Sequence, residues 1–249
     1  MMMKINLIAV KNFPVIKPGD NISKEILTSI AKQRLKLLPE DIIVIAHKIV
    51  SISQGRFVDL SKVRISKKAI QLSKRTGKDR SFCQLVLENS KDIIKASKNV
   101  IITRDKLGLV AANAGIDQSN IKYKNTALLL PKNPNLSAKK ISLAISNSFD
   151  KNLPVIIADS VGRPWRYGLT QISIGSYGIK PLKSYKKDLY NNPLYETEVP
   201  IVDELASTAG LLMEKDVGIP VVLIRGYNYL RSKENSNLLL RSKNNDIFK

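Results

Sequence analysis

Two aspartates stand directly after short apolar runs, where carboxylates could reach a shared cation. Asp117 comes soon after the apolar run 109–112, and Asp159 with Ser160 follows the run 155–158. Mg²⁺ prefers oxygen ligands and shares them with substrate phosphates, so carboxylates at strand ends suit it. The alternative is that both aspartates only cap turns or helices. Residue type and spacing alone leave both interpretations open.

Two arginines close to Asp159 add a second kind of chemistry. Arg163 and Arg166 flank Trp165, the one tryptophan of the chain. A guanidinium group presents a planar fork of donors that matches carboxylate and phosphate oxygens in bidentate fashion. We therefore predict Arg163 and Arg166 to be catalytic residues that contact anionic groups of a substrate.

Several common chemistries are excluded by residue counts and spacing. One histidine and one cysteine rule out histidine-rich zinc sites and sulfur-only sites. His47 lies in the apolar run 42–52, which we expect to be a strand, and this argues against a Ser-His-Asp triad. Gly77 and Lys78 lack the rest of a P-loop, and no G-x-G-x-x-G follows a predicted strand. A nucleotide enzyme with this sequence would use an uncommon scaffold.

The elements that must position these residues alternate between strands and helices. Runs rich in Val and Ile predict strands, and apolar stripes at helical spacing predict helices. The class is therefore α/β, or mixed α+β, in one unit spanning 1–249, with a polar segment 228–249 as a carboxyl-terminal flap or tail. The predicted strands are 5–10, 42–52, 100–103, 109–112, 155–158, 172–174 and 221–224, and the predicted helices are 23–38, 66–75, 79–89, 137–148 and 200–213.

The formal net charge of +20 predicts attraction of anions. Nucleic acid, an anionic membrane surface, or a small substrate with several phosphates and carboxylates would all fit. The lysines and arginines are scattered and form no recognition-helix pattern. No apolar segment is long enough to span a bilayer, and the single cysteine cannot form an internal disulfide. We expect a cytoplasmic protein with no membrane partner and no specific nucleic-acid partner.

Taken in order, several segments resemble the family of coenzyme F-420 precursor to L-glutamate gamma-ligases. The resemblance implies a mixed α/β fold of two interlocked lobes and a homodimer. It also implies a reaction in which GTP, with Mg²⁺ or Mn²⁺ and in some cases K⁺, activates the terminal carboxylate of the precursor's phospholactyl group as an acyl phosphate. L-glutamate then attacks, and a second glutamate can follow. The matching segments are 13–20, 46–51, 55–56, 113–117, 119–120, 128–131, 159–166, 188–190, 203–206 and 218–226.

The resemblance also implies roles for individual residues. The positions that match the family's metal ligands are Asp117, Asp159, Ser160 and either Glu214 or Lys215. The positions that match its nucleotide contacts are Phe13, Pro14, Val15, Ile16, His47, Lys48, Asn120, Met213, Glu214, Lys215, Asp216, Val217, Gly218 and Ile219.

The sequence departs from the family at three places. Ile52 replaces a lysine, Glu214 replaces a glycine, and 191–193 replaces a glycine-containing turn. The departures at Ile52 and Glu214 motivate one alternative function, and the basic surface keeps a second one open. One is a gamma-glutamyl ligase that acts on another phosphorylated metabolite. The other is a basic nucleic-acid-binding protein, in which Asp117 and Asp159 would have no role.

Overall fold

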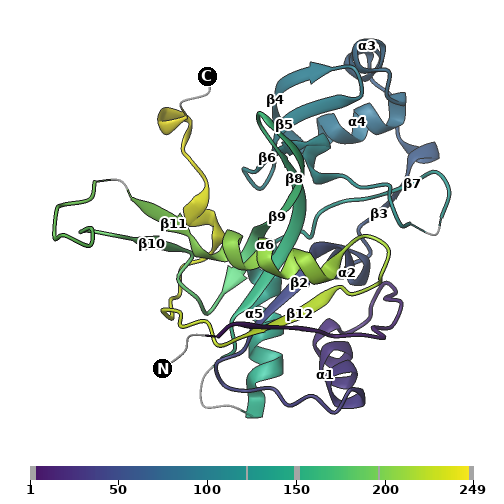
Figure 1. The fold of residues 1–249 in the computed structure, drawn as a ribbon. Helices are drawn as coiled ribbons and strands as arrows, with labels where there is room; N and C mark the ends of the chain where they lie inside the picture. The colour runs from purple at the N-terminus through teal and green to yellow at the C-terminus, as the bar shows by residue number, and fades with distance from the viewer. Residues whose placement is uncertain (1–3, 122, 149–151, 196, 247–249) are drawn as a thin grey trace.

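The computed structural model describes residues 4–121, 123–148, 152–195 and 197–246, and a five-stranded sheet lies at its centre (Figure 1). The strand order is β1-β12-β2-β8-β9. β2 and β8 run parallel, and the other neighbouring pairs are antiparallel. The strands are β1 (Asn6–Ala9), β2 (Ile42–Ala46), β8 (Val155–Arg163), β9 (Arg166–Tyr177) and β12 (Val221–Arg225).

Helices cover both faces of this sheet, which explains why β2 is apolar at successive positions. Successive side chains of a strand point to opposite faces. Ile43 and Ile45 pack in one core, while Ile42 and Val44 pack in the other. The first core is completed by α1 (Ile22–Lys32), α2 (His47–Ser53) and α5 (Pro134–Ile145), and the second by α6 (Ile201–Met213). A strand buried on both faces loses the alternation of an exposed one.

Residues 57–129 form a smaller unit with a core of its own, above the central sheet in Figure 1. Its helices begin at side-chain caps, since Ser66 accepts a hydrogen bond from the Ala69 amide and Asp79 accepts one from the Phe82 amide. The elements are β3 (Phe57–Asp59) paired with β7 (Thr126–Leu128), the sheet β4 (Ser90–Ser97), β5 (Val100–Asp105) and β6 (Val110–Ala112), and the helices α3 (Lys67–Thr76) and α4 (Arg80–Glu88).

A two-stranded arm projects from the body of the molecule (Figure 1). It is built from β10 (Leu182–Ser184) and β11 (Glu198–Pro200), which pair in antiparallel fashion. The loop between them carries exposed Leu189, Tyr190 and Tyr195. Such side chains have no packing role within their own chain, so this arm is a candidate contact surface.

The described part of the carboxyl-terminal segment is docked. The Ser236 hydroxyl is buried and lies 2.6 Å from the Ser173 hydroxyl and 2.9 Å from that of Ser176. Farther along, Asp246 pairs with Arg104 of β5 at 3.0 Å. This segment includes the short helices η4 (Ser236–Leu239) and η5 (Lys243–Asn245), while η1 (Leu60–Lys62), η2 (Asn113–Gly115) and η3 (Ser146–Ser148) lie elsewhere.

The structure confirms the mixed α/β class and corrects two predicted elements. The run 42–52 is not one strand, because β2 ends at Ala46 and α2 begins at His47. A short apolar run cannot distinguish a strand from a buried helix. The predicted helix 23–38 ends early, at Lys32, and the next residues turn through Arg34, which has a φ of 54°. Among the described residues, no helix is both long and apolar enough to cross a membrane.

Candidate active site

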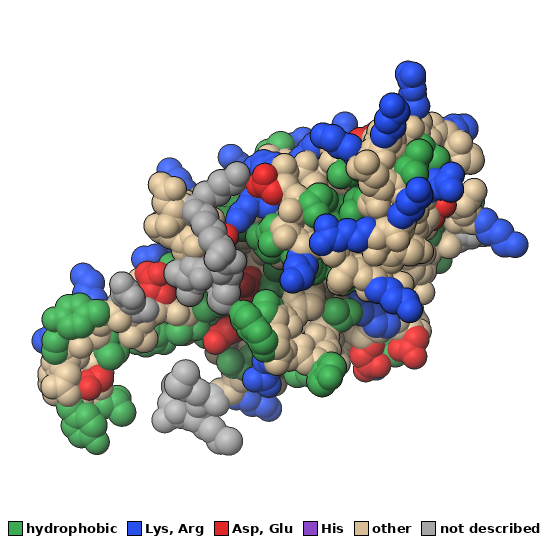
Figure 2. Space-filling model, turned by 90° about the horizontal axis from the view of Figure 1, so that it is seen from above, with side chains coloured by type: hydrophobic (Ala, Val, Ile, Leu, Met, Phe, Trp, Pro, Cys, Tyr) green, Lys and Arg blue, Asp and Glu red, His purple; other side chains and the backbone are tan. Residues whose placement is uncertain are grey.

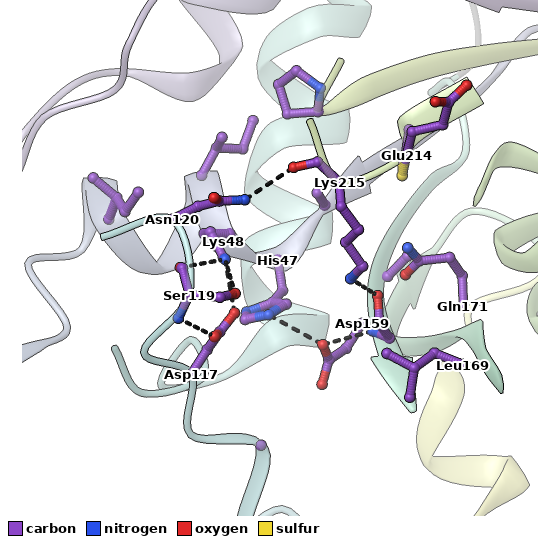
Figure 3. Close-up of a pocket in the computed structure, with 18 of the residues that line it drawn as sticks. His47, Lys48, Asp117, Ser119, Asn120, Asp159, Leu169, Gln171, Glu214 and Lys215 are labelled. Carbon is purple, nitrogen blue, oxygen red and sulfur yellow. Dashed lines mark hydrogen bonds and ion pairs between the residues drawn. The ribbon is translucent and has the colours of Figure 1, made fainter. Parts of the chain in front are cut away.

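A cavity of about 690 Å³ lies where segments far apart in the sequence meet (Figure 3). Its volume is in the range of small-molecule sites. One wall is the junction of β2 and α2, and the facing wall is the segment 111–120 of the smaller unit. The remaining walls come from the β8–β9 hairpin, from the segment 213–220 after α6, and from 13–16 near the amino terminus.

Two consecutive residues at the start of α2 each hold one of the predicted aspartates. His47 Nε2 lies 3.1 Å from Asp159 Oδ1. Lys48 Nζ lies 2.7 Å from Asp117 Oδ2. Because His47 and Lys48 are neighbours, both carboxylates are brought to the same end of α2, although they are far apart in sequence (Figure 3).

Asp117 is positioned by a tight turn and by a bridge to β7. Its amide and carbonyl both pair with Leu128, at 3.0 and 2.8 Å. Before it, Gly115 has a φ of 66°, and a Cβ there would lie 2.6 Å from a Leu130 methyl carbon. Only glycine meets both demands. The sequence therefore fixes where the Asp117 carboxylate enters the cavity.

The electrostatic surroundings of Asp117 keep it ionised. Burial acts to raise the pKa of its carboxyl, but hydrogen bonds from Lys48 and from the Ser119 amide outweigh burial. The pKa therefore lies below the ordinary value, and the side chain is a carboxylate at neutral pH. Its Oδ1 accepts from the Ser119 amide at 2.6 Å.

Asp159 is held through one of its two oxygens. Oδ1 accepts from the Ser160 amide at 2.7 Å and contacts His47. The other ring nitrogen of His47, Nδ1, lies 3.4 Å from the Ser51 hydroxyl. A carboxylate can only accept, so His47 Nε2 carries a hydrogen that it donates to Asp159. His47 is 5% exposed, and both of its ring nitrogens face protein groups rather than the open cavity.

The segment after α6 bridges two walls of the cavity. Lys215 Nζ donates to the Ser160 hydroxyl at 2.6 Å, and the Lys215 carbonyl accepts from the Asn120 amide group at 3.0 Å. At the start of this segment Glu214 has a φ of 37°. The bridge links the β8–β9 hairpin to the smaller unit across the cavity (Figure 3).

Most of the predicted site residues line this cavity, but three do not. Arg163 and Arg166 are backbone partners opposite each other at the turn of the β8–β9 hairpin. Val217 is exposed. The Arg163 guanidinium donates to the Tyr167 carbonyl at 3.4 Å. The predicted residues that line the cavity are Phe13, Pro14, Val15, Ile16, His47, Lys48, Asp117, Asn120, Asp159, Ser160, Met213, Glu214, Lys215, Asp216, Gly218 and Ile219.

Two residues of the hairpin wall were not predicted from the sequence. Gln171 and Leu169 line the cavity because they are the cross-strand partners of Ser160 and Gly162. Residues opposite each other on an antiparallel pair share a face. Recognising that β8 continues into a long hairpin would have revealed them.

The oxygen atoms in the cavity suit a hard cation shared with a substrate. The described residues contain no group of three or more His, Cys, Asp or Glu side chains that could hold a metal alone. Asp117, Asp159 and the Ser160 hydroxyl line the cavity and offer it oxygen ligands. Magnesium is commonly bound by one or two carboxylates, with water and substrate phosphates completing its shell.

A cavity lined by four carboxylates and two lysines, between a central sheet and a smaller unit, defines an enzyme site for charged small molecules. The model of the F420-0:Gamma-glutamyl ligase family matches residues 11–226, and the chain belongs to that family. Similar proteins named Coenzyme F420:L-glutamate ligase occur in Methanocaldococcus jannaschii, at 45% identity over 99% of this chain and 97% of the relative. Those of Methanothermobacter thermautotrophicus and Methanosarcina mazei are each 38% identical over 99% of this chain, covering 100% and 96% of the relatives.

Proposed function

We propose that the chain joins L-glutamate to the phospholactyl end of the coenzyme F-420 precursor at the expense of GTP. The observation that carries the proposal is the convergence of Asp117 and Asp159 at the start of α2, inside a cavity of substrate size. The relatives that share nearly the whole length of the chain bear the name of this ligation. The positive charge of the chain suits a reaction in which GTP, precursor and glutamate are all anionic.

The proposed reaction has two steps. A carboxylate oxygen of the precursor attacks the γ-phosphorus of GTP, so a C–O–P link forms as GDP leaves. The amine of glutamate then attacks the acyl carbon, loses a proton, and releases inorganic phosphate as the amide forms. A second glutamate can be added through the γ-carboxylate of the first. Either step requires neighbouring anions to be brought together, which is an electrostatic task.

The residues divide this task among them. Asp117, Asp159 and Ser160, with the segment at Glu214 and Lys215, would hold Mg²⁺ or Mn²⁺, which offsets charge on the transferred phosphoryl group. His47 orients Asp159 through the 3.1 Å contact. The remaining cavity residues of 13–16 and 213–219 would surround the nucleotide. Arg163 and Arg166, at the hairpin turn, would contact anionic groups of the precursor, and a K⁺ requirement stays a prediction.

The proposal extends to assembly. We infer a homodimer, in which the exposed apolar loop of the β10–β11 arm contacts a second copy, and in which each chain consists of two interlocked lobes. The two-lobe division of 1–249 and the cytoplasmic location stay predictions.

A turnover assay tests the proposed reaction. Purified protein is incubated with GTP, Mg²⁺, the precursor and L-glutamate, and each component is omitted in turn. We expect repeated GDP release only when all are present, because without glutamate the first step stops after one GDP per active site. The product mass should grow by one or two glutamyl units. The main alternative is a ligase that acts on a different acceptor. It predicts no GDP release with the coenzyme F-420 precursor and L-glutamate. Replacing GTP with ATP in a parallel reaction tests the nucleotide.

A further inference from the structure

Lysine ammonium groups contact two of the three side chains that are proposed to bind the metal. Lys48 Nζ lies on Asp117 Oδ2 at 2.7 Å, and Lys215 Nζ lies on the Ser160 hydroxyl at 2.6 Å. Asp159 differs, because its Oδ1 is held by His47 and a backbone amide. The oxygens proposed to bind a divalent cation are thus partly satisfied by protein cations (Figure 3).

Lys48 has used its donors within the protein. An ammonium group has three hydrogens to donate. Besides Asp117, Lys48 Nζ contacts the Ser119 carbonyl at 2.8 Å and the Ser119 hydroxyl at 3.3 Å. The side chains of Lys48 and Asp117 are only 24% and 29% exposed, so water screens the pair less than a surface pair. A phosphate can gain this ammonium only if Lys48 gives up Asp117 or Ser119.

A divalent cation bound to the Asp117 carboxylate would lie close to the ammonium group of Lys48. Two cations that share one carboxylate oxygen repel each other, and the repulsion is larger where water is partly excluded. Lys48 lines the cavity on a flexible four-carbon stem, so its ammonium can turn from Asp117 toward a ligand without movement of α2.

We propose that Lys48 is an exchangeable counter-ion, which holds Asp117 while no metal is bound and transfers to a nucleotide phosphate when the cation takes Asp117. The exchange couples the two ligands: a phosphate frees Asp117 for the metal, and a metal frees Lys48 for the phosphate. Coupling of this kind is reciprocal by thermodynamic necessity. The inference rests on the proposed function, because a phosphate-bearing substrate supplies the second partner of the ammonium.

The test is the affinity for Mn²⁺, measured from the electron paramagnetic resonance signal of the free ion. Each protein is titrated without nucleotide and with saturating GDP, and the ratio of the two dissociation constants is the coupling factor. Lys48→Met is compared with wild type and with Lys62→Met. Lys62 is a matched control, because it pairs with Asp59 at 3.8 Å, is 84% exposed and does not line the cavity.

We expect Lys48→Met to bind Mn²⁺ without nucleotide about fivefold more tightly or better, and its coupling factor to fall about fivefold or more, within the usual range of such couplings. GDP should bind this variant more weakly than wild type. Lys48→Gln, which also lacks the charge, should behave in the same way, and Lys62→Met should match wild type.

Unchanged Mn²⁺ affinity in both Lys48 variants would overturn the exchange, as would a wild-type protein in which GDP does not alter Mn²⁺ affinity. The turnover assay is independent of this result. A protein that glutamylates the precursor yet shows no coupling contradicts the exchange alone, and a coupled protein that does not turn over the precursor contradicts only the proposed acceptor.

Discussion

Asp159 combines a fixed oxygen with an available one. His47 and the Ser160 amide both hold Oδ1, and no described hydrogen bond engages Oδ2. Supporting contacts of this kind orient a carboxylate ligand and are costly to lose. The second oxygen is therefore preset to receive a cation.

Asp159→Asn tests that role. We expect metal-dependent turnover to fall at least about 100-fold, because an amide is a far weaker ligand than a carboxylate. The melting temperature should change little, since asparagine can still accept through its oxygen. Steady-state kinetics across a Mg²⁺ titration would measure the effect. Normal turnover in the variant would mean that the cation is held elsewhere.

Ile52 lines the cavity at a position where the family resemblance implies lysine. Ile52→Lys adds a positive charge on the helix α2 that already carries Lys48. We expect GTP to bind about tenfold more tightly, the usual effect of one hydrogen bond to a charged group. Isothermal titration with GTP measures this, and Ile52→Met, of similar size without charge, is the control. Unchanged affinity in Ile52→Lys would show that the phosphates lie away from α2.

Sequence could identify these residues by type but could not pair them. Asp117 and Asp159 were found from their places after apolar runs. The contacts of His47 with Asp159 and Lys48 with Asp117 depend on β2 lying beside β8 and on the smaller unit meeting α2. The spacing of residues within one segment predicts neither of these long-range contacts. Arg163 and Arg166 show the converse, because their chemistry suggested the site while the hairpin turn places them outside the cavity lining.

The segment that follows α6 contains a strained element. Glu214 ends α6 with a φ of 37° and a ψ of −164°. Residues other than glycine adopt such angles at a cost of about 1–3 kcal/mol. The family resemblance implies glycine at this position, and glycine adopts a positive φ without this cost.

Glu214→Gly should therefore stabilise the protein by about 1 kcal/mol, after the entropy that glycine adds to the unfolded chain is subtracted. Urea unfolding measures the change. Glu204→Gly, within the same helix, should destabilise by about 1 kcal/mol, as glycine does in helices. If Glu214→Gly lost stability as Glu204→Gly does, the claim that the Glu214 backbone is strained would be wrong.

Asp105 ends β5 in a buried turn, where its carboxylate accepts from the Leu109 amide at 2.8 Å. Burial is the main cause that raises the pKa of this carboxyl above the ordinary 3.8, although backbone amides oppose it. The folded state therefore takes up a proton more readily than the unfolded state. The cost of the buried charge is absent below pH 3.8, grows as pH rises toward the folded pKa, and is complete above it.

Asp105→Asn removes this charge and keeps an oxygen for the Leu109 amide. We expect the free energy of unfolding of the variant, minus that of wild type, to be larger at pH 7 than at pH 4, so that the variant gains stability as pH rises. Denaturant titrations at the two pH values provide the comparison. If the variant and wild type differed in free energy of unfolding by the same amount at both pH values, the buried carboxylate would carry no pH-dependent cost.

At the scale of the whole molecule, lysines and arginines are scattered along the sequence, and the face shown in Figure 2 does not gather them into one patch. Figure 2 shows lysine and arginine side chains spread over the body, while hydrophobic side chains gather at the outer end of the β10–β11 arm. A dispersed charge of +20 suits attraction of small anionic substrates. The fold class was predictable from the alternation of apolar runs, but the arm was not, because its strands have three residues each.

The arm predicts the oligomeric state. Leu189, Tyr190 and Tyr195 are 97%, 84% and 82% exposed, so replacing all three with serine should leave the fold of one chain intact. Light scattering after gel filtration should give wild type about twice the chain mass of 27.8 kDa and the variant about that mass. A wild-type monomer, or a variant that stays dimeric, would exclude this arm as the interface.

The account depends most on whether Asp117 and Asp159 hold one cation beside a guanine nucleotide. A crystal structure with GDP and Mn²⁺, using the anomalous signal of manganese, measures this directly. We predict one manganese within coordination distance of both carboxylates and of the GDP phosphates, in the cavity at the start of α2. Manganese bound outside that cavity, or by neither aspartate, would contradict the account.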